Sequence, residues 1–304
     1  MSAVAAALAP ERKSDVWDAF LIAAIFAGMA ALAYAAVATP LLQPLLESAA
    51  REEWSRLTVR PMVIWVAMGI LLMLVRTVFW VRYRPFPAAS LEEAPRLTVV
   101  IPAYNEGAMV EETIASVANA LYPHERLEIL AVDDGSTDDT WNYMRRAARR
   151  FPGRVSTVRL ERNRGKRGAL AEAFRRARGE IVVTIDSDSV IEPGTLLAVV
   201  GPFRDPRVGA VAGKVAVYNR RAGLIPRMLH VRFVLSFDFL RSAQSMFRTV
   251  YCCPGALAAY RLAVVREVLE PWEEQTFLGV PCTYGEDRAL TNFILATGYD
   301  AVYQ

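Results

Sequence analysis

Two long apolar runs open the chain. The stretch from Ala19 to Ala38 is almost entirely aliphatic, alanine and aromatic residues and carries no charge. A second run extends from Pro61 to Val81 and contains one charge, Arg76, near one end. Each run has about the 20 residues that a helix needs to cross a hydrocarbon core. The pattern predicts two transmembrane helices, at about 19–39 and 61–81.

These two spans define a predicted membrane region at residues 1–85. Two crossings return the chain to its starting side, and Arg82 and Arg84 lie where the second span ends, as expected of a cytoplasmic flank. The predicted connecting loop also carries three arginines, so charge supports this orientation only in part. A signal peptide is the alternative for the first run, which is longer than a typical signal core. We expect a multi-pass protein of the inner or plasma membrane with residues 86–304 in the cytoplasm.

After a proline-rich linker at 85–95, short apolar runs alternate with stretches of helical periodicity. This alternation is typical of an α/β fold with a mostly parallel sheet flanked by helices. Ligands of such sheets bind at the carboxyl ends of the strands. The predicted strands are Leu97–Ile101, Leu127–Val132, Val155–Leu160 and Ile181–Ile185, and the predicted helices between them are Met109–Leu121, Asp138–Arg150 and Lys166–Arg178.

Composition removes several classes of function. A hydrophobic content of 54% with 22% charged residues excludes a disordered chain. The net charge of +3 gives no large basic excess, so nucleic acid is not expected as a partner. The two histidines make a multi-histidine zinc site untenable and a Ser/His/Asp triad unexpected. The three cysteines lack CxxC spacing and form no disulfide framework, which fits a reducing compartment.

Three predicted strands end in acidic or aromatic residues. They lead into Pro102-Ala103-Tyr104-Asn105-Glu106, Asp133-Asp134-Gly135-Ser136 and Asp186-Ser187-Asp188. Each alone could be a solvated turn or a helix cap. Asp186 and Asp188 are two residues apart, so their carboxylates would repel each other unless a cation lay between them. The pair predicts Mg²⁺ or Mn²⁺ bridging to phosphate oxygens.

Two further segments carry candidate chemistry at predicted helix starts. Lys166 lies in the loop Asn163-Arg164-Gly165-Lys166-Arg167-Gly168, where backbone N–H groups and an ammonium can meet phosphates. The loop lacks Walker A spacing, which disfavours a P-loop ATPase. Asp287 precedes the predicted helix Ala289–Thr297 and is placed to act as a base on a hydroxyl. A solvated loop and a plain helix cap are the structural alternatives.

Together these motifs resemble the family 2 glycosyltransferases of the GT-A fold, specifically the processive membrane synthases of β-linked polysaccharides. The resemblance is strongest to hyaluronan synthases, followed by rhizobial chitooligosaccharide and chitin synthases. It covers about Leu97 to Gln304 and implies a Rossmann-like GT-A domain at residues 86–304. Its most specific segments are Gln244-Ser245-Met246-Phe247, Cys252-Cys253-Pro254-Gly255-Ala256-Leu257-Ala258-Ala259-Tyr260-Arg261, and Trp272 through Cys282 to Gly285-Glu286-Asp287-Arg288-Ala289-Leu290-Thr291-Asn292.

The resemblance implies an inverting transferase that moves a sugar from UDP-GlcNAc, UDP-GlcA or both to a growing polysaccharide acceptor. Asp287 would be the catalytic base. Asp186 and Asp188 would hold the metal, with Asp188 the better candidate for direct coordination. Nucleotide-sugar contacts would come from Ala103, Tyr104, Glu106, Asp133, Asp134, Lys166 and Asp186, and acceptor contacts from Gly255, Glu286 and Arg288.

The chain departs from the family pattern at two places. Pro254-Gly255-Ala256 stands where hyaluronan synthases usually have Ser-Gly-Pro, which leaves the acceptor and product open. Such synthases follow the Glu-Asp element with Gln-x-x-Arg-Trp and further transmembrane helices, and the sequence reaches Gln304 before either. We therefore expect part of a longer protein that by itself binds UDP and metal weakly and makes no long polymer. A non-processive lipid-linked transferase and a silent nucleotide-sugar-binding subunit are the alternatives.

One more segment favours the lipid bilayer as a partner of this protein. Leu224–Phe247 is strongly apolar with Arg227, Arg232 and Arg241 interspersed, and Arg248 follows it directly. This pattern fits an amphipathic helix at a membrane surface, as the resemblance favours, or a helix packed on the catalytic core.

Overall fold

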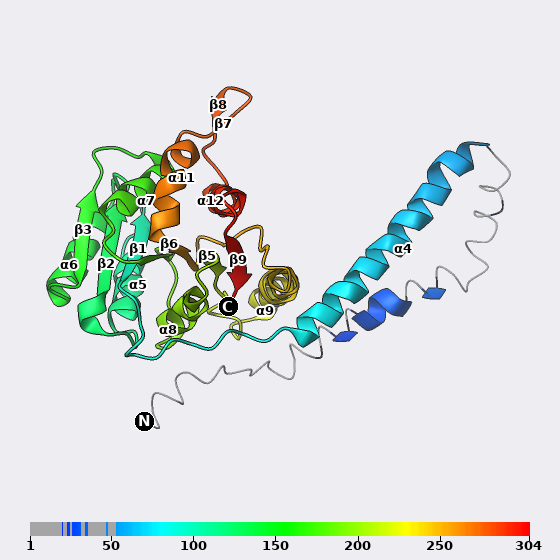
Figure 1. Ribbon diagram of the computed structural model, residues 1–304, viewed down its shortest axis with the longest axis horizontal. Coiled ribbons are helices and arrows are strands. Elements are labelled where there is room, and N and C mark those ends of the chain that lie inside the picture. Colours follow the sequence, from blue (N-terminus) through cyan, green and yellow to red (C-terminus); the bar gives the residue numbers. More distant parts are fainter. Residues whose placement is uncertain (1–19, 21–22, 25, 32–33, 36–46, 48–52) are drawn as a thin grey trace. The chain divides into compact units, whose positions relative to one another are not determined.

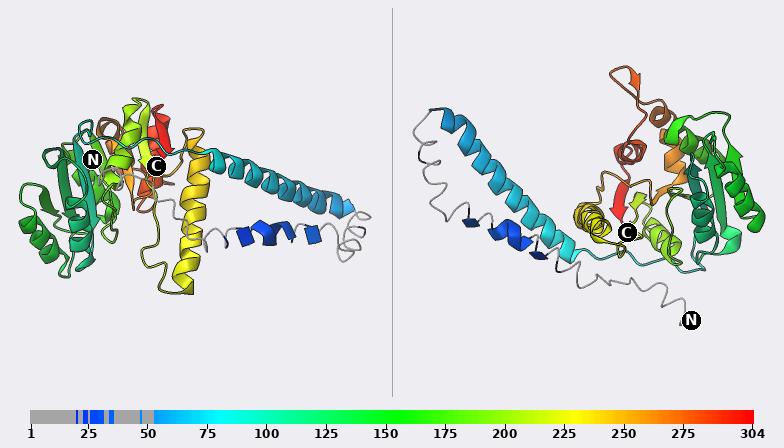
Figure 2. Two further views of the ribbon diagram at one scale, coloured as in Figure 1. Left: turned by 90° about the horizontal axis from the view of Figure 1, so that it is seen from below. Right: turned by 180° about the vertical axis from the view of Figure 1, so that it is seen from behind.

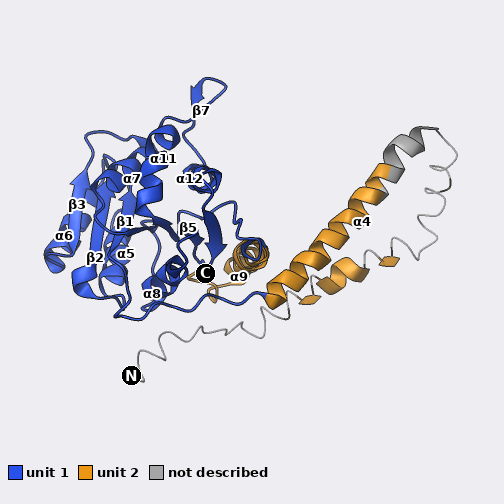
Figure 3. Cartoon of the chain, in the orientation of Figure 1, with its two compact units in different colours: residues 1–9, 83–215, 244–304 blue, residues 10–82, 216–243 orange. Residues whose placement is uncertain are grey.

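The structure is a computed structural model that describes residues 20, 23–24, 26–31, 34–35, 47 and 53–304. The chain divides into two compact units, shown in different colours in Figure 3. The described part of the first unit is residues 83–215 and 244–304, and the second unit comprises residues 10–82 and 216–243. The candidate chemistry lies in the first unit.

A seven-stranded sheet forms the centre of the first unit (Figure 1). Its strand order is β3-β2-β1-β4-β6-β5-β9. Strands β1 to β4 are parallel to one another, whereas β6 runs antiparallel to both of its neighbours. The strands are β1 (Leu97–Ala103), β2 (Leu127–Asp133), β3 (Val155–Arg159), β4 (Ile181–Thr184), β5 (Val208–Ala212), β6 (Ala258–Arg261) and β9 (Asp300–Tyr303).

Helices cover both faces of this sheet (Figures 1 and 2). Alternate residues of β1 face opposite layers, as strand geometry requires. Val99 and Ile101 pack with α5 (Met109–Ala118), α6 (Thr140–Arg150) and α8 (Thr195–Val200). Val100 packs with α7 (Gly165–Arg176), α11 (Leu262–Glu273) and α12 (Glu286–Ala296). Because β1 is buried on both faces, its sequence is apolar except for Thr98, as expected of a central parallel strand.

The reversed strand β6 decides which loops reach the carboxyl edge of the sheet. Ala258, the first residue of β6, pairs with Thr184, the last residue of β4. The loop that precedes β6 therefore arrives at the edge where β1, β2 and β4 end. The helix α12 leads into β9, which is parallel to β5, so its first turn also begins near that edge.

The first half of the α/β prediction is confirmed. The strands β1 to β4 and the helices α5 to α7 match the predicted segments to within a few residues at their ends. The sequence pattern did not predict β5, β6 or β9. A short antiparallel hairpin, β7 (Thr276–Phe277) and β8 (Val280–Pro281), lies between α11 and α12.

The second unit contains α4 (Glu53–Arg82) and the helical segment formed by α9 (Leu224–Phe233), η3 (Val234–Phe239) and the first residues of α10 (Leu240–Ser245). The indole of Trp80 packs edge-on against Phe239, with ring centroids 5.7 Å apart. η3 has π-helical geometry. Leu224–Phe247 was predicted as one helix, and helix is confirmed through Ser245.

One helix in the described residues, at Ile64–Arg82 within α4, is long and apolar enough to cross a membrane. Its most apolar window has a mean hydropathy of 2.1, and none of that window is buried in the protein. Of the first predicted span, at 19–39, residues 20, 23–24, 26–31 and 34–35 are described and are helical, and the other residues of the span lie outside the described part of the chain. The connecting loop was predicted to extend to the second apolar run, but residues from Glu53 onward already belong to α4, because Glu, Arg and Leu are good helix formers.

Candidate functional site

A cluster of charged side chains lies at the carboxyl edge of the sheet. Lys166, in the first turn of α7, forms an ion pair with Asp186, which follows β4. The Lys166 ammonium also lies 3.6 Å from Glu286 Oε1 on α12. The backbone N–H of Gly255 donates to Asp287 Oδ2 at 3.4 Å. The structure therefore brings together five of the predicted site residues, from three different elements and the loop before β6.

Gly255 lies between the two sides of this cluster. A Cβ at this position would lie 2.5 Å from Lys166 Nζ and 3.3 Å from Asp186 Oδ1. With glycine here, the backbone approaches the ion pair closely while the Lys166 ammonium keeps its place beside Asp186.

The loop after β2 contacts the loop that carries Lys166. Asp134 is buried, and its Oδ1 accepts the backbone N–H of Arg164 at 2.8 Å. Gly135 has a φ of +74°, and a Cβ there would lie 2.7 Å from the carbonyl carbon of Arg162. The Asp-Asp-Gly-Ser sequence is thus both a turn and the contact surface for the Lys166 loop.

The loop after β1 is held against the same turn. Asn105 has a φ of 54°, and its backbone N–H donates to Ser136 Oγ at 3.0 Å. The N–H groups of Glu106 and Gly107 both donate to Thr140 Oγ1 at 2.9 Å. Thr140 is fully buried and was not among the predicted site residues. The spacing of Asp138 and Thr140 is a turn signal that could have indicated this anchor, because Thr140 Oγ1 in turn donates to Asp138 Oδ1 at 2.6 Å.

Two residues predicted to contact the nucleotide sugar are buried in this framework. Asp133 is fully buried, its Oδ1 accepts the Ser136 N–H at 3.0 Å, and its Oδ2 lies 3.1 Å from Arg159 Nε. The Ala103 carbonyl accepts the Asp134 N–H at 2.9 Å. These contacts shape the turn. In contrast, the side chain of Tyr104 is 44% exposed at the same edge and is accessible to a ligand.

The pKa values of Lys166 and Asp134 are each set by burial and by an opposing influence of neighbouring groups. Burial disfavours the ammonium of Lys166, but the carboxylates of Asp186, Glu286 and Asp287 outweigh it and hold the pKa of Lys166 above its ordinary value. Burial raises the pKa of Asp134, against the N–H groups of Arg164 and Gly165, which lower it. The Lys166 side chain therefore remains cationic, beside an excess of negative charge.

That excess bears on the predicted metal. Among the described residues, no group of three or more His, Cys, Asp and Glu side chains could hold a metal ion by itself. Asp186 is half-buried and Asp188 is exposed at the edge. Two carboxylate ligands suit Mg²⁺ or Mn²⁺ when phosphate oxygens and water complete the shell. The donor set therefore fits a metal that binds together with a diphosphate.

Buried contacts fix the start of α12. Gly285, with a φ of +73°, caps the helix in the left-handed conformation. Trp272, fully buried on α11, donates from Nε1 to the Glu286 carbonyl at 2.8 Å. The guanidinium of Arg167 lies over the Trp272 ring at 5.3 Å and donates to the Trp272 carbonyl. Arg167 and Trp272 were not assigned roles from the sequence; a buried tryptophan whose N–H needs an acceptor is the signal that could have indicated one of them.

Arg288, predicted to contact the acceptor, is exposed beside Asp287. Its guanidinium lies 5.3 Å from the ring centroid of Tyr251, which is itself 45% exposed. This aromatic contact fixes the direction of a cation at the rim of the site.

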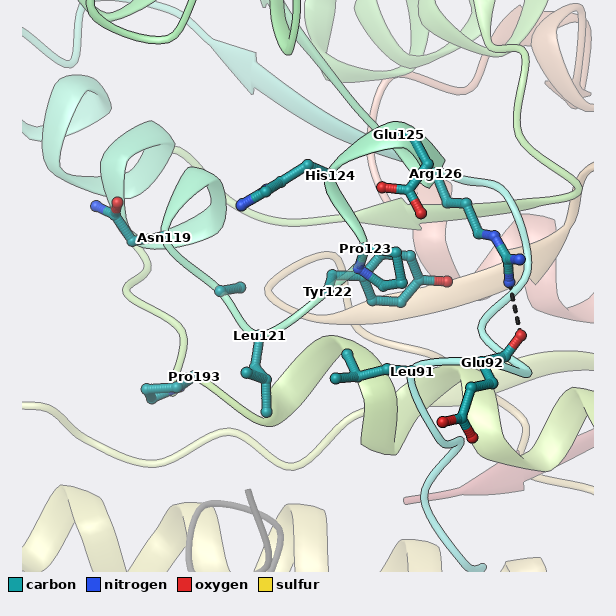
Figure 4. A pocket seen from close by; sticks show the side chains of 11 residues that line it. Leu91, Glu92, Asn119, Leu121, Tyr122, Pro123, His124, Glu125, Arg126 and Pro193 are labelled. Carbon is teal, nitrogen blue, oxygen red and sulfur yellow. Dashed lines mark hydrogen bonds between the residues drawn. The ribbon is translucent and has the colours of Figure 1, made fainter. Parts of the chain in front are cut away.

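A pocket away from this edge is shown in Figure 4. It lies near the amino ends of β1 and β2. Arg126, which lines it, donates to the Glu92 carbonyl at 2.8 Å, and Tyr122 donates to the Pro95 carbonyl at 2.5 Å. Ligands of α/β sheets bind at the opposite edge, and the charged cluster lies there.

The first unit has the GT-A α/β fold, a mostly parallel sheet flanked by helices. The profile of the family described as Glycosyl transferase family 2 matches residues 98–269. The match covers more than half of the chain, so the chain belongs to this family. This confirms the resemblance stated from the sequence.

Two curated relatives show the similarity along most of the chain. An N-acetylglucosaminyltransferase of Azorhizobium caulinodans is 35% identical over 215 residues, which are 70% of this chain and 54% of the relative. A hyaluronan synthase of Streptococcus pyogenes is 36% identical over 227 residues, which are 73% of this chain and 53% of the relative. The chain thus spans about half the length of the curated relatives it matches.

A solved structure shows the same fold. A mannosyltransferase from Pyrobaculum calidifontis, in complex with GDP-Man and Mn²⁺, superposes with a TM-score of 0.56 at 28% identity, covering 80% of this chain and 66% of the other. That enzyme was solved with a nucleotide sugar and a divalent metal.

Proposed function

We propose that this chain carries the catalytic domain of an inverting, membrane-bound glycosyltransferase that extends a β-linked polysaccharide from a UDP-sugar donor. The observation that carries the proposal is the meeting of Lys166, Asp186, Gly255 and Asp287 at the carboxyl edge of one sheet. A cation for a diphosphate and a carboxylate base for a hydroxyl are the two groups that sugar transfer needs, and here a single glycine separates them.

On the donor side, Tyr104, Glu106 and Asp134 would contact the uridine, with Ala103 and Asp133 shaping the turn beneath it. Lys166 would bind the diphosphate at the first turn of α7, where the helix N-terminus also favours negative charge. A divalent metal held by Asp186 and Asp188 would neutralise charge that grows on the departing UDP.

On the acceptor side, Asp287 would take the proton of a sugar hydroxyl. The hydroxyl oxygen then attacks the anomeric carbon of the α-linked donor from the opposite face and forms the β-glycosidic bond. The bond from that carbon to the diphosphate oxygen breaks, and its electron pair leaves with UDP, whose charge the Lys166 ammonium stabilises. Gly255, Glu286 and Arg288 would line the acceptor side of the same space.

We also propose that the second unit anchors the protein in a bilayer, with two spans at about 19–39 and 61–81 and the catalytic domain in the cytoplasm. Support comes from α4, whose apolar window is not buried in the protein. Leu224, Ile225 and Met228 at the start of α9 are 73%, 80% and 63% exposed. Exposed apolar residues beside arginines on one helix suit a membrane surface.

The product follows from which donors are consumed, and the two curated relatives favour different products. Similarity to a hyaluronan synthase supports UDP-GlcNAc and UDP-GlcA as donors, and similarity to an N-acetylglucosaminyltransferase supports UDP-GlcNAc alone. Their identities to this chain, 36% and 35%, do not separate the two.

The test is metal-dependent UDP release from the complete gene product in membranes, with UDP-GlcNAc, UDP-GlcA and UDP-Glc offered singly and in pairs, and GDP release from GDP-Man. Release that needs UDP-GlcNAc and UDP-GlcA together supports a hyaluronan-type synthase, and sustained release with UDP-GlcNAc alone supports a chitin-type synthase. A lipid-linked single sugar as product would replace the processive proposal.

The matched control is Asp287→Asn, which keeps the size of the side chain and removes the base. We expect it to lower kcat by about 10²- to 10⁴-fold, as loss of a general base does, and to leave UDP affinity unchanged. If no donor releases nucleotide although the protein is folded and binds UDP, the chain is a silent binding subunit and the proposal is wrong.

A further inference from the structure

Thr291, on α12 one turn after Asp287, is fully buried and bonded on two sides. Its Oγ1 donates to the Asp287 carbonyl at 2.8 Å and accepts the backbone N–H of Cys253 at 3.0 Å. The first bond, to the carbonyl four residues earlier, is the one that a threonine inside a helix ordinarily makes. The second bond joins α12 to the loop before β6, which is 38 residues away in the sequence.

These bonds belong to a closed ring. From Asp287 the ring passes through Thr291 to Cys253, continues along the backbone to Gly255, and returns through the Gly255 N–H to Asp287 Oδ2 at 3.4 Å. Cys253 is fully buried, and its carbonyl accepts the hydroxyl of Tyr260 on β6 at 3.2 Å. The ring is therefore anchored on the central sheet.

The ring borders the donor side at Gly255, where a Cβ would lie 2.5 Å from Lys166 Nζ and 3.3 Å from Asp186 Oδ1. Loss of the Thr291 hydroxyl would remove this acceptor from the buried Cys253 N–H. Because losing a buried hydrogen bond is costly, we expect the loop backbone at Cys253 to shift toward a different acceptor. A shift of the loop would change the distance between Asp287 and the ion pair.

We infer that Thr291 is a positioning residue that holds the carboxylate of Asp287 at its distance from Gly255, Lys166 and Asp186. The inference rests on the proposed function, in which Asp287 is the base. Thr291 itself touches neither sugar nor nucleotide. Its hydroxyl sets the geometry of proton transfer and not the affinity for the donor.

The test compares three variants of the complete gene product. Thr291→Val keeps the shape and removes both bonds, Thr291→Ser keeps the hydroxyl, and Thr98→Val is the matched control. Thr98 is equally buried, donates to Glu128 Oε2 at 2.6 Å and accepts the Gly179 N–H at 2.9 Å. It lies at the start of β1, at the edge of the sheet opposite the site.

We expect Thr291→Val to lower kcat by about 10- to 100-fold, since a misplacement of about 1 Å costs on that order, with donor KM and UDP affinity within twofold of wild type. Thr291→Ser should restore kcat. Thr98→Val should unfold at a lower temperature but keep the kcat of its folded fraction. Wild-type kcat in Thr291→Val, or equal loss of kcat in Thr98→Val, would overturn the inference.

Two further variants keep the test decisive. If Thr291→Val does not fold, Tyr260→Phe removes the hydroxyl that anchors the Cys253 carbonyl, and with it the ring, to β6. We expect a several-fold loss of kcat at unchanged donor KM, and unchanged kcat there would also overturn the inference. Asp287→Asn separates the two proposals. An inactive Asp287→Asn beside a fully active Thr291→Val refutes only the positioning role, whereas an active Asp287→Asn refutes the proposed base.

Discussion

The two sides of the candidate site are built in different ways. On the donor side, Asp134, Lys166 and Asp186 follow strands or begin a helix within consecutive strand–helix units, and their loops are joined by backbone bonds such as Arg164 N–H to Asp134 Oδ1. On the acceptor side, Gly255 precedes a reversed strand and Asp287 begins a helix that precedes the edge strand β9. Contacts between residues distant in sequence, such as Cys253 with Thr291, join these elements.

This difference indicates which property a substitution on each side should change: nucleotide binding on the donor side and the geometry of the reaction on the acceptor side. The donor side depends on tight turns and charge, so a small local change there should alter nucleotide binding. The acceptor side depends on buried hydrogen bonds between distant segments, so changes there should alter the geometry of the reaction. Substitutions on the two sides should therefore affect different kinetic constants.

Of the substitutions that test this comparison, we expect the largest effect from one on the donor side. Lys166→Met removes the cation that we assign to the diphosphate. A hydrogen bond to a charged group contributes about 1.5 to 3 kcal/mol, so we expect UDP affinity, measured by calorimetry, to fall by about 10- to 100-fold and the donor KM to rise. The Gly255 contact with Asp287 should remain.

The control for this change is Arg178→Met, which removes one positive charge at the amino edge of the sheet. The side chain of Arg178 is 87% exposed and lies 3.9 Å from Glu128 Oε1. Its loss should leave UDP affinity unchanged. If both variants weaken UDP equally, general charge and not the placement of Lys166 governs nucleotide binding, and the two sides are not distinct in the way proposed here.

The same comparison explains how much the sequence could predict. The donor side follows from local rules: apolar runs predicted β1 to β4, and parallel strands bring their ends to one edge, so the Asp186 and Asp134 motifs could be located from periodicity alone. On the acceptor side, β6 has the sequence Ala-Ala-Tyr-Arg, which carries no strand signal of its own. Its reversed direction depends on pairing with β4 and β5, which are distant in sequence. Gly255 was therefore assigned by resemblance alone, whereas Asp287 was a candidate base from its place at a predicted helix start and was assigned that role by resemblance. Thr291, Trp272 and Arg167 had no assigned role.

Two glycines sharpen the comparison at the level of stability. Gly135 on the donor side and Gly285 on the acceptor side have nearly equal φ angles, +74° and +73°. A Cβ at Gly135 would lie 2.7 Å from the Arg162 backbone, whereas a Cβ at Gly285 would meet no atom within 4 Å. Left-handed backbone costs a non-glycine residue about 1 to 2 kcal/mol, and overpacking adds about 1 to 3 kcal/mol.

We therefore expect Gly135→Ala to lower the free energy of unfolding by about 2 to 5 kcal/mol and Gly285→Ala by about 1 to 2 kcal/mol. Denaturant unfolding followed by tryptophan fluorescence would measure both. The two alanine variants share the backbone penalty and serve as controls for each other. Equal losses of unfolding free energy in the two variants would show that the Arg162 backbone moves away from a Cβ at position 135 at no energetic cost. That result would contradict the tight packing described here.

The smallest effect concerns the strands that complete the acceptor side. Asp205 precedes β5, and Arg248 joins it to Asp300 at the start of β9, with Arg248 Nε 2.6 Å from Asp300 Oδ2. The Arg207 N–H, which donates to Asp205 Oδ1 at 3.0 Å, and then the Arg248 guanidinium lower the pKa of Asp205 to about 2. The folded protein therefore holds the ionised form more strongly than the unfolded chain, in which the pKa is near its ordinary value of 3.8.

It follows that this carboxylate stabilises the fold fully above pH 3.8, and that the contribution is lost as pH falls through about 2. Because Asp205 is partly exposed, solvent screens the pair, and we expect Asp205→Asn to cost only about 1 kcal/mol at pH 7. The gap between wild type and Asp205→Asn should narrow below pH 3.8 and close near pH 2. A gap that stays constant from pH 7 to pH 2.5 would mean that the ion pairs do not hold β5 to β9, and that the acceptor side rests on its buried hydrogen bonds alone.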